Sequence, residues 1–163
     1  MKRDEAIFAA GCFWGVQYYF DQVPGVTSTE AGYTGGLADN PTYWEVVGHG
    51  TGHAEALKIE FDPDKVSYQT LLKHFFRIQD PTARYRPDGI NEGDNYRSAI
   101  FYTNDEQKKT AQALVDKLNK EKYGGKIATE ITKAGKWWPA EEYHQEFTKK
   151  TGRGACHVDY SPI

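Results

Sequence analysis

Cys12 and Glu55 are the two residues of this sequence whose type and setting most favour chemistry. Cys12 lies between an apolar segment, predicted to be a strand, and the first turn of a predicted helix. There the helix dipole and free backbone N–H groups favour a thiolate, the reactive form of cysteine. The flanking Gly11 and Gly15 let another group approach the backbone closely. A free cysteine is also often an inert core residue, and the local sequence leaves both interpretations open.

Glu55 belongs to an alternating segment, residues 53–61, that predicts a strand. The odd-numbered face of this strand also carries Leu57, Ile59 and Phe61. A carboxyl group on that apolar face would have its charged form desolvated and its pKa raised, which suits a general acid. If Glu55 instead lies at the very end of the strand, it reaches solvent and has no such role.

The elements that must position these two residues alternate along the chain. Periodicity and turn residues predict strands over 5–10, 26–33, 53–61, 97–103 and 126–133, and helices over 14–22, 40–48, 67–79, 104–123 and 139–149. Asn40 and Pro41 are expected to begin the second helix, as its N-cap and first residue. Asn104 with Gln107 is typical of a cap for the fourth, and Trp44 is expected to pack within the second. Such interleaving predicts an α/β or α+β sheet covered by helices.

The composition indicates one soluble globular domain over residues 1–163. Hydrophobic residues make up 39% and charged residues 26% of the chain, the balance of a folded domain rather than of a disordered or fibrous chain. The net charge of −3 argues against a nucleic-acid partner, because such a surface is basic. No apolar run approaches the roughly 18–20 residues of a membrane-spanning helix. The charged N-terminus lacks a secretory h-region, so we expect a cytoplasmic protein with no membrane partner.

Cys12 and Cys156 are the two cysteines, and they lie near opposite ends of the chain. Without a secretion signal, a structural disulfide is the less favoured use of such a pair. The cysteines and five histidines match no zinc-ligand spacing, since Cys156 and His157 are adjacent and no Cys-x-x-Cys occurs. We therefore expect no metal, and a redox or nucleophilic role for at least one thiol.

Six segments, in order along the chain, resemble the sequence pattern of the A-type peptide methionine sulfoxide reductases. The first is Gly-Cys-Phe-Trp-Gly at residues 11–15. The others are Gly-Tyr-Thr-Gly-Gly at 32–36, Asn-Pro-Thr-Tyr at 40–43, Thr-Gly-His-Ala-Glu at 51–55, Tyr-Arg-Ser-Ala-Ile at 96–100 and Glu-Tyr-His-Gln at 142–145. One such string would be weak support, whereas six in order, over nearly the whole chain, are highly specific.

The resemblance implies a fold and an activity. The implied fold is α+β, a two-layer α/β sandwich with a mainly antiparallel mixed sheet and a ferredoxin-like core. The implied activity is that of an oxidoreductase, a peptide-methionine (S)-S-oxide reductase, which reduces methionine-S-sulfoxide, free and in proteins, and so repairs oxidised proteins. A dithiol such as thioredoxin would be the reductant, no further cofactor is implied, and a monomer is expected.

By position, the resemblance assigns roles to both cysteines. Cys12 would attack the sulfoxide sulfur and become a sulfenic acid, with Phe13 and Trp14 forming the pocket for the substrate's methyl group. Cys156 matches the resolving cysteine, on a mobile C-terminal tail over about 150–163 that reaches back to Cys12. The resulting Cys12–Cys156 disulfide would then be reduced by thioredoxin through thiol exchange.

The resemblance also assigns the groups around the sulfoxide oxygen. Glu55 matches the acid that protonates this oxygen, which is a poor leaving group until then. Tyr43 and Tyr96 match two hydroxyl donors that stabilise charge on it. Asn91 occupies the slot of the family's second carboxylate, in a loop one residue longer than usual, and an amide holds no charge. Three nearby carboxylates are alternatives that the sequence leaves open: Asp88, Glu92 and Asp94.

Other histidines and tryptophans have structural interpretations. His144 lies in a matching segment, but we expect it to bind backbone or the tail rather than substrate. His53 is expected to orient the turn before Glu55. Trp137 and Trp138 are expected in the core rather than in a pocket.

Three other functions stay open on the residues alone. A thiol peroxidase would share the two cysteines but needs a cationic partner for its thiol rather than an aromatic pocket. A cysteine hydrolase needs a histidine base, which no spacing places beside Cys12. An aromatic-lined domain that binds peptides or oligonucleotides by stacking would carry a basic surface, whereas this chain is acidic.

Overall fold

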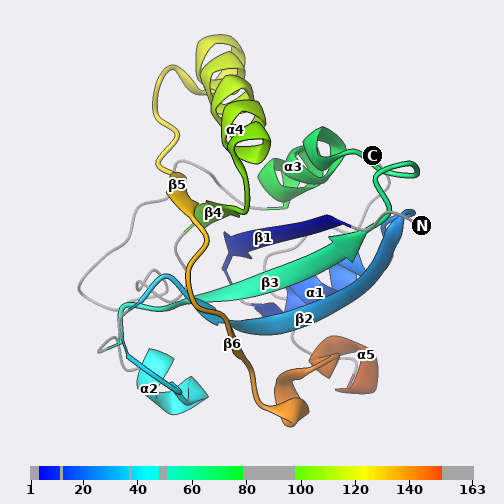
Figure 1. The fold of residues 1–163 in the computed structure, drawn as a ribbon, viewed down its shortest axis with the longest axis vertical. Coiled ribbons are helices and arrows are strands. Elements are labelled where there is room, and N and C mark those ends of the chain that lie inside the picture. Colours follow the sequence, from blue (N-terminus) through cyan, green and yellow to red (C-terminus); the bar gives the residue numbers. More distant parts are fainter. Residues whose placement is uncertain (1–3, 12, 37, 48–50, 79–97, 152–163) are drawn as a thin grey trace.

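A six-stranded sheet forms the centre of the structure, a computed structural model that describes residues 4–11, 13–36, 38–47, 51–78 and 98–151 (Figure 1). In chain order the elements are β1 (Asp4–Ala10), α1 (Phe13–Phe20), β2 (Val26–Thr34), α2 (Tyr43–Val47), β3 (Ala54–Phe61), α3 (Tyr68–Arg77), β4 (Ser98–Tyr102), α4 (Asp105–Leu118), the π-helical turn η2 (Asn119–Tyr123), β5 (Glu130–Lys133), β6 (Trp138–Pro139), the 3₁₀ turn η3 (Glu142–His144) and α5 (Phe147–Thr151). Most predicted elements are present, with ends shifted by a few residues.

The sheet has the topology of a ferredoxin-like core with one strand added at each edge. Apart from the short helix α2, the elements from β1 to β4 follow the order β-α-β-β-α-β. The strand order is β5-β4-β1-β3-β2-β6, in which β5 pairs with β4 in parallel and the other four pairs are antiparallel. The implied α+β fold with a ferredoxin-like core is confirmed, and its sheet is mixed.

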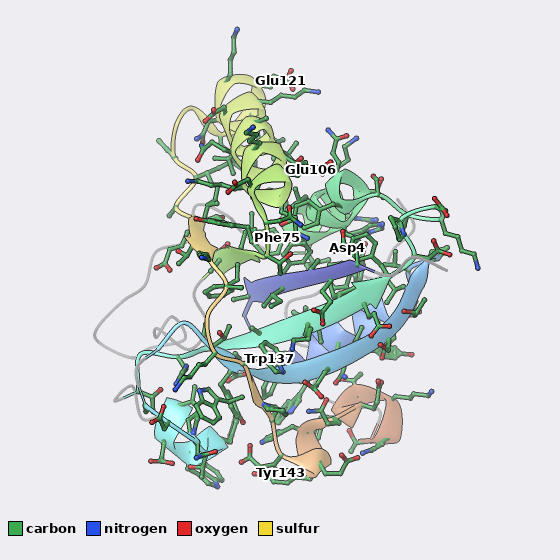
Figure 2. The ribbon with its side chains drawn as sticks, viewed as in Figure 1. Asp4, Phe75, Glu106, Glu121, Trp137 and Tyr143 are labelled. Atoms are coloured by element: carbon green, nitrogen blue, oxygen red, sulfur yellow. The ribbon has the colours of Figure 1, made fainter. Side chains whose placement is uncertain are left out.

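The main core lies between the sheet and the helices α1, α3 and α4. The helices α1 and α3 pack against the strands, and α4 lies beside α3 (Figure 1). The large, fully buried side chains of this core are Phe8, Phe20, Leu57, Ile59, Phe61, Leu71, Leu72, Phe75 and Ile78. The ring of Phe75 on α3, labelled in Figure 2, lies 5.0 Å from the ring of Phe8 on β1. Each such buried side chain stabilises the fold by about 1.5–3 kcal/mol, so this face fixes the sheet against its helices.

The opposite face of the sheet carries a smaller buried cluster, which is covered by the chain that follows β5. Among the described residues, four of its six clustered buried side chains are alanines, Ala9, Ala54, Ala56 and Ala99, and the other two are Ile7 and Phe101. Trp137 packs on this face, donates its indole N–H to Glu30 and stacks under the ammonium group of Lys58 at 4.9 Å (Figure 2). Gly32 leaves room for the Trp137 ring, which a Cβ at this position would meet. The core interpretation of Trp137 is confirmed.

The helix α2 begins later than the sequence predicts. Asn40 has a φ of 47° and therefore does not have the extended backbone of an N-cap. Thr42 caps the helix instead, because its Oγ1 accepts the N–H of Glu45 at 3.3 Å while Oε1 of Glu45 accepts the N–H of Thr42 at 3.0 Å. This reciprocal pair is a capping box, and it fixes Tyr43 as the first helical residue.

The single helix predicted over 139–149 is wrong. Gln145 interrupts it, since its side chain pairs with the backbone of β2 as a neighbouring strand would. Its Oε1 accepts the N–H of Ala31 at 2.9 Å, and its Nε2 donates to the carbonyl of Ala31 at 2.8 Å. Glu146 then turns the chain with a φ of 58°. The segment from β6 to α5 is thereby held against the β2 edge of the sheet.

Among the described helices, none is both long and apolar enough to span a membrane.

Candidate active site

The carboxyl group of Glu55 lies buried at the beginning of α1. Glu55 is on β3, opposite Tyr33 of β2, and only 1% of its surface is exposed. The chain leaves β1 through Gly11, whose φ of 90° is unstrained only for glycine, and enters α1 at Phe13. The backbone N–H of Phe13 donates to Oε1 of Glu55 over 3.4 Å. The predicted position of Glu55 on the apolar face of its strand is confirmed, and the solvent-exposed alternative is wrong.

Four aromatic side chains beside this carboxyl form one cluster. We call Phe13, Trp14, Tyr43 and His144 the aromatic cluster. The Tyr43 and His144 rings lie 4.4 Å apart, and Phe13 and Trp14 lie 5.4 and 5.6 Å from His144. Phe147 of α5 stacks on Trp14 at 4.0 Å and covers its outer face. The cluster therefore joins the first turn of α1, the first turn of α2 and the segment from η3 to α5.

His144 is part of the cluster through its ring and through a hydrogen bond. The indole N–H of Trp14 donates to Nδ1 of His144 at 2.9 Å. A neutral imidazole that accepts at Nδ1 carries its proton on Nε2. That Nε2 is buried and has no hydrogen-bond partner among the residues that the structure describes. Burial lowers the pKa of His144, and the charge of Glu141 only partly opposes this, so the neutral ring is favoured.

Glu141 ties Tyr43 to the sheet. One of its oxygens accepts the hydroxyl proton of Tyr33 at 2.8 Å, and the other accepts the backbone N–H of Tyr43 at 3.0 Å. Burial alone would raise the pKa of Glu141, but these hydrogen bonds and the nearby His144 hold it below its usual range. Conversely, burial and the bond to Glu141 raise the pKa of the Tyr33 hydroxyl. Glu141 is thus a carboxylate that fixes the position of α2.

His53 ties the loop after β2 to the turn that precedes Glu55. Its Nδ1 accepts the N–H of Gly36 at 3.0 Å, and its Nε2 lies 2.7 Å from the carbonyl oxygen of Ala38. The backbone N–H of His53 donates to Oγ1 of Thr51 at 3.1 Å. A ring that bonds the loop at both nitrogens holds β3 and the start of the α2 loop together.

The structure brings together half of the site residues that the sequence suggested. Those that lie together are Phe13, Trp14, Tyr43 and Glu55. Cys12, Asn91, Tyr96 and Cys156 lie outside the described residues, as do Asp88, Glu92 and Asp94.

Sequence reasoning missed Glu141 and assigned His144 no place in the aromatic cluster. The nearest signal was the matching segment at 142–145, which begins one residue after Glu141. Trp138 packs against Phe13 and its neighbours rather than in the main core. The expectation for Trp44 is wrong, because 74% of its surface is exposed.

The aromatic cluster is suited to contact a small apolar group, and the Glu55 carboxyl group is suited to transfer a proton near it. Aromatic faces bind methyl and thioether groups favourably. A buried carboxyl group close by can donate or accept a proton where water is excluded. Among the described residues, no three histidine, cysteine, aspartate or glutamate side chains are grouped so that they could hold a metal ion.

Comparisons with known proteins agree on one family. A family model described as "Peptide methionine sulfoxide reductase" matches residues 4–163. Peptide methionine sulfoxide reductase MsrA of Acidobacterium capsulatum is 46% identical, over 94% of this chain and 99% of its own length. The crystal structure of Mxr1 from Saccharomyces cerevisiae in reduced form is similar with a TM-score of 0.86 at 29% identity, covering 97% of this chain and 92% of that one. Mxr1 in complex with Trx2 shares the fold, with a TM-score of 0.64 at 23% identity over 90% and 85% of the two chains.

Proposed function

The chain belongs to the peptide methionine sulfoxide reductase family, as an oxidoreductase of its A type, and we propose that it reduces the S epimer of methionine sulfoxide, free and in proteins, to methionine. The observation that carries this proposal is the buried Glu55 carboxyl at the N–H of Phe13, beside the aromatic cluster. Cys12 directly precedes Phe13 in the sequence, and this supports Cys12 as the nucleophile of the same site.

In the first step, the thiolate of Cys12 attacks the sulfoxide sulfur and Glu55 supplies the proton. Sulfoxide, thiolate and proton give methionine and a sulfenic acid on Cys12, so that the cysteine sulfur is oxidised by two electrons and the substrate sulfur is reduced. Glu55 is buried where water is excluded, next to the first turn of α1, and this position supports it as the proton donor.

The remaining groups bind the substrate. Phe13 and Trp14 are proposed to supply apolar contacts to its methyl group, and their ring contacts with His144 support a fixed position for both side chains. Tyr43, anchored by Glu141, and Tyr96 are proposed to donate their hydroxyl protons to the sulfoxide oxygen as charge develops there. Asn91, or one of the carboxylates near it in sequence, fills the remaining polar position.

In the second step, the thiol of Cys156 attacks the Cys12 sulfur, which releases water and forms a Cys12–Cys156 disulfide. We place this cycle in one catalytic domain over residues 1–163, with Cys156 on a C-terminal tail. The proposed reductant is thioredoxin, whose two thiols take up the oxidation as a disulfide of their own. Mxr1 has the same fold as this chain, and its solved complex with Trx2 supports thioredoxin as the partner. No other cofactor takes part.

Epimer-resolved turnover tests the proposal. The protein is incubated with both epimers of methionine sulfoxide and dithiothreitol, and each epimer is followed by chiral chromatography. We expect loss of the S epimer alone, and no loss with Cys12→Ser. Loss of the R epimer, equal loss of both, or unchanged turnover in the Cys12→Ser protein would contradict the proposal.

A further inference from the structure

Two large aromatic side chains are exposed at one end of the molecule. Trp44 of α2 is 74% exposed and Tyr143 of η3 is 57% exposed, and they are the large apolar side chains most accessible to solvent among the described residues. Tyr143 lies at the lower edge of the molecule in Figure 2, and α2 lies at the same end in Figure 1. Tryptophan and tyrosine are the residue types that protein interfaces favour, because they offer a large rigid surface at low entropic cost.

These two exposed rings contact the aromatic cluster from outside it, and they are not isolated surface residues. Trp44 meets Tyr43 edge-on at 5.4 Å, and Tyr143 lies 4.2 Å from His144. Between them, Tyr43 and His144 are in contact at 4.4 Å. An unbroken series of ring contacts therefore leads from the buried part of the site to the surface.

One carboxylate oxygen bridges the two segments that carry the exposed rings. Oε2 of Glu141 accepts the backbone N–H of Tyr43, next to Trp44, at 3.0 Å and the hydroxyl proton of Tyr143 at 3.4 Å. The helix α2 and the turn η3 are thus held side by side, which places the two exposed rings on one part of the surface.

We propose that Trp44 and Tyr143 form a docking surface for the polypeptide that carries the sulfoxide, and that they bind an apolar or aromatic side chain next to it in the substrate. This inference rests on the proposed function and adds to it a preference, among sulfoxides in polypeptides, for those in accessible, apolar segments. Continuity with the candidate site is what assigns the surface to the substrate rather than to a separate partner.

The spacing of the rings between Phe13 and Trp44 suits an extended peptide. Ring centroids lie 6.5 Å apart from Phe13 to Tyr43 and 5.4 Å apart from Tyr43 to Trp44. An extended chain advances about 3.3 Å per residue, so a side chain within about four residues of the sulfoxide reaches Trp44 when the sulfoxide lies against Phe13. Free methionine sulfoxide has no such side chain and cannot use this surface.

The charges around the surface disfavour an acidic partner. Exposed Glu45 follows Trp44, and exposed Glu142 precedes Tyr143. Lys150 approaches Glu142 at 3.9 Å and offsets part of its charge, whereas Glu45 adds its charge beside the helix cap. An aspartate or glutamate near the sulfoxide would be repelled, and an uncharged apolar side chain would not.

The test compares substrates that differ in one flanking residue. The substrates are N-acetylmethionine sulfoxide, a glycine-rich peptide with a central methionine sulfoxide, and the same peptide with phenylalanine three residues before or after it. We expect kcat/KM for one phenylalanine peptide to exceed that for the glycine peptide by about 5- to 10-fold, mainly through KM. Trp44→Ala should reduce this ratio to below about 2, Trp44→Phe should restore part of it, and N-acetylmethionine sulfoxide should be reduced at the wild-type rate.

Tyr123→Ala is the matched control, because Tyr123 is a partly exposed aromatic residue of η2, an element separate from α2 and from η3. It should leave the ratio unchanged. Equal kcat/KM for all peptides in the wild type would overturn the docking surface alone. A Trp44→Ala protein that loses activity equally toward every substrate, changes only the KM for thioredoxin, or dissociates a dimer would also overturn it. If the wild type reduced no sulfoxide at all, the proposed function itself would fail.

Discussion

At the residue scale, the site depends on polar side chains that satisfy one another across long sequence separations. The indole N–H of Trp14 donates to His144, which lies 130 positions away in the sequence. The carboxylate of Glu141 accepts the hydroxyl proton of Tyr33, 108 positions away, and the backbone N–H of Tyr43, 98 positions away. Each of these bonds is at least partly buried, where a lost partner would leave a group unsatisfied. The aromatic cluster is therefore held by hydrogen bonds as well as by ring packing.

The Trp14–His144 bond predicts a pH-dependent stability. Because burial lowers the pKa of His144 below the usual value of 6.5, the folded state binds fewer protons than the unfolded state just below that pH. The stability is complete above about pH 6.5 and declines as the pH falls through the lower pKa of the folded state.

His144→Asn tests this, because an asparagine oxygen can take the place of Nδ1 as the acceptor and does not titrate. We expect the wild type to lose stability relative to this variant between about pH 7.5 and pH 5, as measured by urea denaturation. A difference between the two proteins that stays constant over this range would contradict a neutral His144 in the folded state.

The limits of sequence reasoning are clearest for these same residues. The position of Glu55 could be predicted, since alternation along one strand decides which face a side chain takes. Glu141 and His144 could not be placed in this way, because their partners come from β2, α1 and α2, which only the folded topology brings near η3. The resemblance covered the segment of His144 but indicated no contact with Trp14.

At the element scale, the local sequence pattern predicted most strands and the capped helix α4, but it did not predict the segment from β6 to α5. The Asn104 cap of α4 is present as predicted, with its Oδ1 accepting the N–H of Gln107 at 2.8 Å. The cap of α2 was misplaced because Thr42 and Glu45 form a better pair than Asn40 and Pro41. The final helix is broken because a side chain, Gln145, pairs with β2, and helical periodicity cannot reveal such a tertiary bond.

The connection between η3 and α5 predicts a second pH effect, with the opposite sign. Glu146 donates its backbone N–H to Gln17 of α1 at 2.8 Å, and its side chain faces Asp21 of the same region. Burial, the hydrogen bond to Asp21 and its charge raise the pKa of Glu146 to about 7, although Lys149 and Lys150 oppose this. The folded state therefore binds more protons than the unfolded state, and stability is lost as the pH rises from about 4.5 through about 7.

Glu146→Gln should relieve this loss, since the amide is uncharged at every pH. We expect its thermal midpoint to exceed that of the wild type by roughly 2 °C at about pH 8, and to match it at about pH 4.5. Calorimetry at the two pH values measures this. A gain that is the same at both would show that the charge of Glu146 is not its cause.

At the scale of the whole molecule, the ferredoxin-like topology brings the start of α1, strand β3 and the C-terminal segment to one site. Parts of the chain that begin near residue 11 and end near residue 151 meet there. The proposed cycle uses the same proximity, because Cys156 follows α5 by a few residues in the sequence.

Cys156→Ser tests that use of the C-terminal segment. Without added reductant, the variant should still form about one methionine per enzyme, because the step at Cys12 needs no second thiol. Thioredoxin-dependent turnover should fall by at least about 100-fold, because no intramolecular disulfide forms. Full turnover with thioredoxin would contradict the assignment of Cys156, and the wild type measured with dithiothreitol serves as the control.

The proton of Glu55 is the central claim, and single-turnover kinetics of Glu55→Gln test it most directly. Methionine formation is followed by rapid quench with enzyme in excess and no reductant, for the wild type, Glu55→Gln and Glu55→Asp. We predict a rate at least about 100-fold lower for Glu55→Gln and an intermediate rate for Glu55→Asp, with the thermal midpoint recording whether each variant is folded. A folded Glu55→Gln protein that forms methionine within a few-fold of the wild-type rate would contradict the account.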